Sequence, residues 1–145
     1  MINQLNDLGH SLERKLKVYG EFLEATLLLQ EALEKEEMAA VAQLLTRREE
    51  LIMDIDGLDR RINRYRQEGL FDRSSEITQR MGKLPEEIGR ALKQIVSANQ
   101  ACDTIAASRC EATRKELMIL SQEGKCLRGY AHKTEQIPKF LNLHT

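Results

Sequence analysis

The sequence has few aromatic residues and almost no proline. Tryptophan is absent, aromatic residues make up 4% of the 145 residues, and only two prolines occur, both after Leu84. Strands are typically rich in aromatic and β-branched side chains, whereas here Leu, Ile and Ala supply most of the apolar surface. This composition favours an all-α fold. The length predicts a single domain, residues 1–145, that buries a core without disulfides or metals.

The sequence also lacks an excess of charge of one sign. It has 22 basic and 23 acidic residues, for a net charge of −1, so no overall field attracts nucleic acid or an anionic membrane. One basic cluster, Arg60-Arg61-Ile62-Asn63-Arg64-Tyr65-Arg66, resembles a phosphate-binding helix. Because acidic residues surround it, we interpret these cations as stabilising a helix C-terminus, with Ile62 and Tyr65 facing the core. We expect no nucleic-acid partner.

Long apolar runs and cysteine frameworks are missing too. No segment approaches 18 apolar residues, and the N-terminus has neither a basic region nor an apolar run, so we expect no membrane insertion and no signal peptide. The cysteines, Cys102, Cys110 and Cys126, are odd in number and lack metal-type spacing. This pattern suits free thiols in a reducing compartment and predicts a cytoplasmic protein.

No catalytic or metal-binding pattern is recognisable. His10, His132 and His144 are isolated, and Asp7 with His10 gives one Asp-x-x-His where a two-metal bundle requires further carboxylates and a second such unit. Neither a phosphate-binding loop nor a Gly-x-Gly-x-x-Gly motif occurs, and nothing indicates a nucleophile beside a histidine. We therefore expect no enzymatic activity, no cofactor and no metal.

What the sequence does have is helical periodicity. The first apolar stripe advances by three or four residues at each step, about 3.67 on average, which predicts a nearly straight helix over residues 1–35. It consists of Leu5, Leu8, Leu12, Leu16, Tyr19, Leu23 and Leu27. A second stripe predicts a helix over residues 37–68. It consists of Met38, Val41, Leu45, Arg48, Ile52, Ile55, Ile62 and Tyr65, widened by Leu44, Leu51 and Leu58.

The ends of these helices have recognisable signals. Carboxylates favour helix N-termini, so the run Glu34-Lys35-Glu36-Glu37 predicts a tight break just before Glu36 or Glu37, although one continuous helix is the alternative. Gly69 suits a left-handed C-cap. Ser74 or Ser75 is able to cap a short helix over residues 75–84.

Pro85-Glu86-Glu87 is a strong start signal for a third helix, over residues 85–123. Its apolar face consists of Ile88, Leu92, Ile95, Ala98, Cys102, Ile105, Ala112, Leu117 and Leu120. The alanine-rich middle allows close approach but buries little area, so we expect it to be the least stable part of the bundle or the part that changes partners. In the tail, residues 124–145, glycine and proline interrupt any helix while apolar side chains persist. We predict an elongated antiparallel helical bundle, a long hairpin plus a short and a long third helix, with a partly irregular tail.

The order of these segments resembles a known family. A hairpin containing Leu44-Leu45-Thr46-Arg47-Arg48-Glu49-Glu50-Leu51-Ile52 is followed by a long third helix, by Gly129-Tyr130 and by Ile137-Pro138-Lys139-Phe140-Leu141. This order resembles the FlgN-type flagellar type III secretion chaperones over nearly the whole chain. The resemblance implies a cytosolic chaperone that binds hook-filament junction (hook-associated) subunits, prevents their premature assembly and delivers them to the export gate. It also implies that the C-terminal region holds the subunit's terminal helices, and that Tyr130, which matches by position, contributes to docking on the gate.

Elementary physics is consistent with this role, because an amphipathic partner helix adds to an incomplete bundle by laying its apolar stripe in a groove. We expect helix three and the tail to supply that surface, through Leu117, Leu120, Leu127, Tyr130, Ile137, Phe140 and Leu141. One alternative is that the tail residues pack on their own bundle. Another is that the chain is a coiled-coil adaptor or structural spacer, and self-association into a homo-oligomer stays open.

Overall fold

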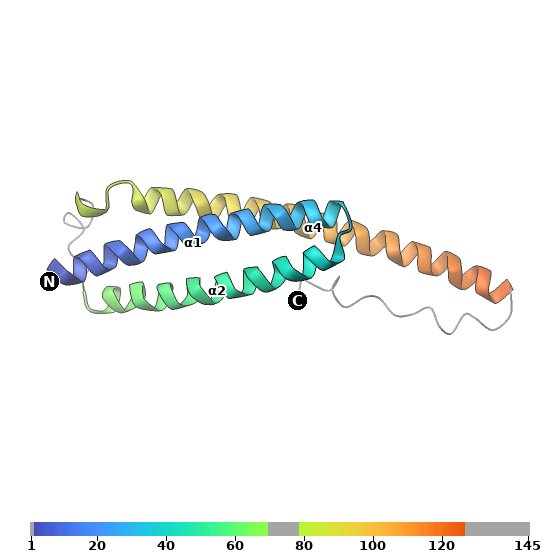
Figure 1. The fold of residues 1–145 in the computed structure, drawn as a ribbon, viewed down its shortest axis with the longest axis horizontal. Coiled ribbons are helices and arrows are strands. Elements are labelled where there is room, and N and C mark those ends of the chain that lie inside the picture. Colours follow the sequence, from blue (N-terminus) through green and yellow to red (C-terminus); the bar gives the residue numbers. More distant parts are fainter. Residues whose placement is uncertain (1, 70–78, 127–145) are drawn as a thin grey trace.

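The computed structural model describes residues 2–69 and 79–126, and within them the chain forms three long helices. These are α1 (Ile2–Glu34), α2 (Met38–Gln67) and α4 (Leu84–Cys126). Helix α1 packs against both α2 and α4 along its length (Figure 1). The predicted all-α, elongated antiparallel bundle is therefore confirmed. The predicted tail lies outside the described residues from Leu127 onward.

A Schellman turn separates α1 from α2, so the alternative of one continuous helix is wrong. Glu36 adopts a left-handed conformation, with φ of 57°. The Glu37 N–H donates to the Ala32 carbonyl at 2.9 Å and the Glu36 N–H to the Leu33 carbonyl at 3.3 Å. Both bonds satisfy carbonyls that the end of α1 leaves free. Left-handed backbone usually requires glycine, so a glutamate at this position is only a weak signal for a turn.

The other helix ends follow their sequence signals more closely. Gly69 ends α2 with φ of 79°, as predicted, and its N–H donates to the Arg66 carbonyl. Helix α4 starts at Leu84, one residue before Pro85, with Glu86 and Glu87 in its first turn. The predicted short helix at 75–84 lies mostly outside the described residues. Its last turn is present at residues 79–81 and ends at Gly82, which has a positive φ.

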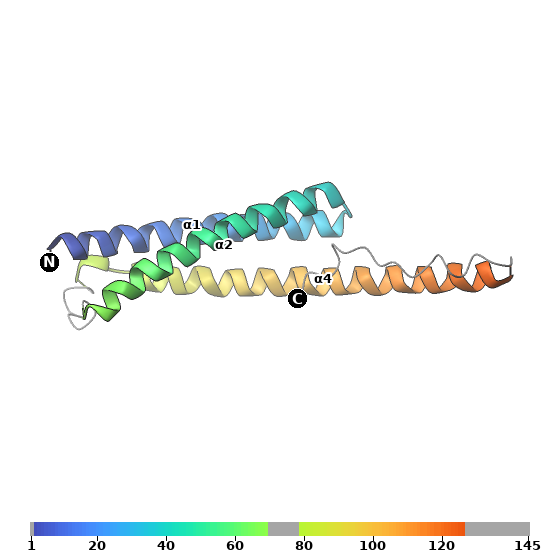
Figure 2. The same cartoon turned by 90° about the horizontal axis from the view of Figure 1, so that it is seen from below.

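Helix α4 is longer than the sequence indicates. We predicted an end at residue 123, before Gly124, but the helix continues through this glycine to Cys126. A single glycine costs a helix interior only about 1 kcal/mol, which explains why it does not end the helix here. Figures 1 and 2 show that the C-terminal part of α4 projects well beyond the turn that joins α1 to α2.

Each of the three helices has a series of buried and half-buried positions that recur alternately every three and four residues, which is heptad spacing. In α1 they are Leu8, Ser11, Lys15, Val18, Phe22, Ala25, Leu29 and Ala32. In α2 they are Val41, Leu44, Arg48, Leu51, Ile55, Leu58, Ile62 and Tyr65. In α4 they are Leu84, Ile88, Ala91, Ile95, Ala98, Cys102, Ile105 and Arg109. We call each of these rows of residues the seam of its helix. A repeat of 3.5 residues keeps the seam facing the neighbouring helices along the length of the bundle.

The observed burial shows that part of the predicted core is wrong. The stripe drawn through leucines in α1 advances by more than 3.5 residues per step, so it drifts off the seam, and Leu27 ends exposed. In α2, Ile52 is 42% exposed, whereas its neighbour Leu51 is 1% exposed. In α4, Leu92 and Ala112 are exposed rather than buried. The sequence stripes favoured large apolar residues, but the seam also includes small and polar ones.

Small residues bring α4 close to α1, as the alanine-rich sequence indicates. Ala98, Cys102 and Ala106 are buried, and the Cys102 Sγ donates to the Thr26 carbonyl on α1 at 3.4 Å. The Thr26 hydroxyl in turn donates to the Phe22 carbonyl at 2.8 Å. The predicted close approach of helix three is thus present in the middle of the bundle.

Candidate partner-binding surface

Helices α2 and α4 lie on either side of α1 and leave a groove between them. Both pack extensively on α1, but within residues 2–69 and 79–126 no comparable packing joins α2 to α4. We call this hollow the α2–α4 groove, and it encloses about 420 Å³. Its lining consists of Leu29, Leu33, Leu45, Arg48, Glu49, Ile52, Asn99, Cys102, Asp103 and Ala106. Side chains of α2 and α4 still meet in the core clusters on α1, so the groove is an open hollow above a three-helix core.

The floor and walls of the groove are largely apolar. Leu29 and Leu33 of α1 form the floor and are almost completely buried. Leu45 and Ile52 of α2 form one wall, and Ile52 keeps much of its side chain exposed. An exposed apolar wall above an apolar floor is the geometry that receives the apolar face of a helix.

Arg48 is the main cation in the groove. Its guanidinium lies 4.8 Å from the centroid of the Phe22 ring, and Nη2 donates to Asn99 Oδ1 on α4 at 2.7 Å. The Nε of Arg48 is buried and has no hydrogen-bond partner. Burial lowers the pKa of this guanidinium and raises the pKa of the nearby Cys102 thiol. This Nε is covered by the chain's own atoms, so it is not open to an acceptor on the groove surface.

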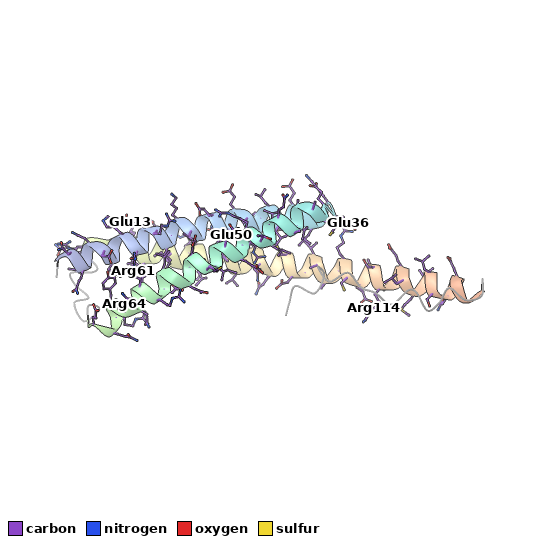
Figure 3. All side chains as sticks on the ribbon, turned by 60° about the horizontal axis from the view of Figure 1, so that its bottom comes forward. Glu13, Glu36, Glu50, Arg61, Arg64 and Arg114 are labelled. Atoms are coloured by element: carbon purple, nitrogen blue, oxygen red, sulfur yellow. The ribbon has the colours of Figure 1, made fainter. Side chains whose placement is uncertain are left out.

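Beyond the turn, α4 continues as residues 110–126, which we call the α4 extension (Figure 2). Arg109 marks its root, because Nη2 donates to the Glu34 carbonyl at 2.8 Å and Nη1 lies 3.2 Å from Glu36 Oε1. Figure 3 shows Glu36 at the turn and Arg114 farther out on the extension. Met118, Ile119 and Leu120 of the extension are all more than half exposed. Apolar side chains thus face solvent on a helix that has left its own bundle.

One side of α4 carries exposed apolar residues both in the bundle and in the extension. Its positions advance alternately by four and three residues, so they share one face of the helix. We call it the open face of α4. It consists of Leu92, Val96, Asn99, Asp103, Ala106, Cys110, Thr113, Leu117 and Leu120. Asn99, Asp103 and Ala106 of this face line the α2–α4 groove, so the face continues from the groove into the extension.

Two of the seven predicted partner-binding residues lie on this surface. Leu117 is half-buried and Leu120 is 54% exposed, both on the extension. The other five, Leu127, Tyr130, Ile137, Phe140 and Leu141, lie outside the described residues. Sequence reasoning missed the groove residues of α2, chiefly Ile52 and Arg48. Arg48 did stand out as a cation within an apolar stripe, which was the available signal.

The basic cluster at the end of α2 has the predicted core-facing residues. Ile62 is buried among Leu5, Leu8 and Met81, and Tyr65 packs against the same cluster. Arg64 lies in the last turn, where a cation stabilises the helix C-terminus. About one turn earlier in α2, Asp59 Oδ1 forms an ion pair with Lys15 Nζ of α1 at 2.7 Å. These contacts tie the cluster to the bundle.

Two further findings concern the described part of the chain. Its His, Cys, Asp and Glu side chains form no group of three or more that suits a metal ion. None of its helices combines the length and the apolar character needed to cross a membrane.

Similarity gives no independent identification. Comparison with protein-family models, with curated proteins and with solved structures found no match to this chain.

Proposed function

We propose that this protein is a carrier that binds an amphipathic helix of another protein in the α2–α4 groove and along the α4 extension. The observation that supports this most directly is that α4 leaves its own bundle with exposed apolar residues on the face that lines the groove. A guest helix with apolar residues at i, i+3, i+4 and i+7 would complete the bundle.

The energetics of the extension favour a bound partner. An isolated helix of about 17 residues is only marginally stable in water, because most helix stability in proteins comes from packing an apolar face. Each Å² of apolar surface of Leu117 and Leu120 that a partner covers contributes about 25 cal/mol to binding. Binding therefore stabilises both the extension and the guest.

The identity of the client comes from the sequence resemblance. We propose a cytoplasmic FlgN-type flagellar export chaperone whose clients are hook-filament junction subunits, held by their terminal helices until delivery to the type III export gate. Tyr130 is the proposed gate-docking residue. In this proposal the protein has no enzymatic activity and needs no cofactor.

A second candidate is a coiled-coil adaptor or structural spacer. The heptad spacing of the buried positions in all three helices favours it, since the same spacing builds scaffolds. A scaffold does not require a specific client helix, so client binding separates the two functions.

The test is co-purification of the full chain with the hook-associated subunits encoded in the same genome. We expect a stable complex with at least one of them. We expect truncation after Arg109, which removes the α4 extension and the residues after it, to abolish the complex while leaving the remaining helices folded, because the bundle core lies before residue 110. Full client binding by the truncated chain would contradict the assignment.

A matched variant separates client binding from delivery. Tyr130→Ala should reduce export of the client more than it reduces formation of the complex. An equal loss of both would remove the docking role of Tyr130. If no hook-associated subunit binds the full chain, the flagellar proposal fails and the spacer becomes the better account.

A further inference from the structure

Two acidic residues of α2 have no charged partner, although others on the same helix do. Glu50 Oε2 lies 3.5 Å from Arg47 Nη1, and Arg47 Nη2 lies 3.7 Å from Glu21 Oε2 of α1. Glu49 and Asp56 are exposed, and neither forms an ion pair or a hydrogen bond with the described residues. Their carboxylates are therefore available to a cation from another molecule.

Both carboxylates belong to the row of α2 residues that borders the groove. Its positions advance alternately by four and three residues, so they share one face of the helix. We call it the open row of α2, and it consists of Leu45, Glu49, Ile52, Asp56, Asp59 and Asn63. The first three line the α2–α4 groove, and the last three line the hollow that follows it along α2. An exposed apolar residue, Ile52, thus lies between two unpaired acids.

Helix α4 presents a similar combination across the groove. The hydrogen bond between Arg48 and Asn99 fixes the level of the two helices. Because α2 and α4 run in opposite directions (Figure 1), one turn onward in α2 and one turn back in α4 bring Ile52 and Val96 to the same level. Val96 is 48% exposed, and Asp103 is the single charged residue on the open face of α4. Apolar side chains and carboxylates therefore border both sides of the groove.

We propose that the client helix carries lysine or arginine on both sides of its apolar stripe over the part that lies in the α2–α4 groove. This inference rests on the proposed function, because it specifies the chemistry of the helix that the groove receives. The two rows that face the client hold carboxylates at positions 49, 56 and 103, and neither the open row of α2 nor the open face of α4 contains a lysine or an arginine. Opposite charges beside the apolar stripes of two helices select the partner and its register.

The cations near the groove are engaged within the chain or lie beyond its apolar part. Arg48 lies beneath the edge of the groove, where it interacts with Asp103 and its Nε is covered. Lys15 is held in its ion pair with α2. Arg60 and Arg66 line the hollow that follows the groove toward the C-terminus of α2. We therefore expect the basic flanks of the client to end at the level where Arg60 begins.

The test uses two synthetic helical peptides of about 28 residues, the length that spans the open face of α4 from Leu92 to Leu120 at 1.5 Å per residue. Both peptides have the same heptad stripe of leucine, which lysine flanks in one peptide and glutamate in the other. We expect the full chain to bind the lysine-flanked peptide at least about tenfold more tightly, a difference of about 1.4 kcal/mol. Fluorescence anisotropy at about 0.15 M salt, with each peptide below its self-association concentration, gives the two dissociation constants.

Charge-reversed variants locate the effect on α2. Glu49→Lys and Asp56→Lys should each reduce the preference for the lysine-flanked peptide at least about threefold, because each removes an opposite charge and adds a like one. The matched control is Asp54→Lys, which makes the same charge change on the same helix about 200° around from Ile52. It should keep the preference. Circular dichroism of each variant monitors folding.

The outcomes separate this inference from the proposed function. A chain that binds neither peptide and no hook-associated subunit overturns both. If a hook-associated subunit binds but the lysine-flanked peptide does not, the inference alone fails. Equal binding of the two peptides overturns it, as does an effect of Asp54→Lys as large as that of Glu49→Lys. Binding of the lysine-flanked peptide only after removal of residues 127–145 would make that segment the occupant and overturns it as well.

Discussion

At the α1–α2 turn, a single glutamate occupies a position that glycine normally takes. Glu36 is left-handed, and its carboxylate lies 3.2 Å from Arg109, which also caps the C-terminus of α1 through the Glu34 carbonyl. The ion pair is substantially exposed, and exposed pairs contribute little. The left-handed backbone costs a non-glycine residue roughly 1–2 kcal/mol. The conformational cost therefore outweighs the ion pair.

Glu36→Gly should accordingly stabilise the protein. We expect the free energy of unfolding to rise by about 0.5–1 kcal/mol, measured by urea denaturation of the full chain. The control is Glu37→Gly, because Glu37 has a φ of −84° and gains nothing from glycine. A loss of stability in Glu36→Gly would show that the contact with Arg109 dominates the turn.

At the level of elements, α4 is one helix with two different environments. Up to Arg109 it packs on α1 through residues such as Ile95 and Cys102, which are almost completely buried. After Arg109 its exposed apolar residues have no comparable seam within the described part of the chain. Local stability follows packing, so the two parts should open independently.

Hydrogen exchange measures this difference directly. In the full chain without a client, amides of residues 111–123 should exchange at least about tenfold faster than those of residues 91–106, because only the latter segment includes buried side chains that resist opening. Mass spectrometry of peptic fragments separates the two regions. Uniform protection along the whole of α4 would contradict this prediction.

The alanine-rich middle of α4 belongs to the same element. It is expected to be the least stable part of the bundle or the part that changes partners, and this stays a prediction. Ala98 and Ala106 are buried in it, and Cys102 bonds to the α1 backbone. Ala106 also lines the α2–α4 groove, so the stretch borders the candidate binding surface.

At the scale of the whole molecule, charge is balanced even where cations cluster. The chain has a net charge of −1, and the arginines at the end of α2 lie beside Asp56 and Asp59, the latter paired with Lys15. Association with a polyanion depends on the net charge of the contact surface and weakens steeply with salt.

We therefore expect no retention on heparin at the physiological ionic strength of about 0.15 M. The measurement is the salt concentration at elution for the full chain. A matched variant, Arg61→Ser with Arg64→Ser, should elute at nearly the same salt concentration as the wild type. Firm retention of the wild type that this variant loses would establish the basic cluster as an anion-binding surface.

The sequence by itself determined the helices and most of their ends. Apolar spacing defines α1 and α2, and Gly69 and Pro85 mark ends that depend on local backbone chemistry. These features are local, since they involve residues within a few positions of each other. Leu117 and Leu120 were also found from sequence, because both are large apolar residues on a helix.

Only the tertiary structure decided which side of each helix is covered. Leu51 is buried and Ile52 exposed although they are neighbours of similar size, because the direction from which α1 approaches selects between them. The groove likewise requires three helices to be placed before its walls exist, and the exposure of the extension depends on where the α1–α2 turn falls beside Arg109. These features arise from contacts between segments far apart in the chain, which periodicity within one segment does not specify.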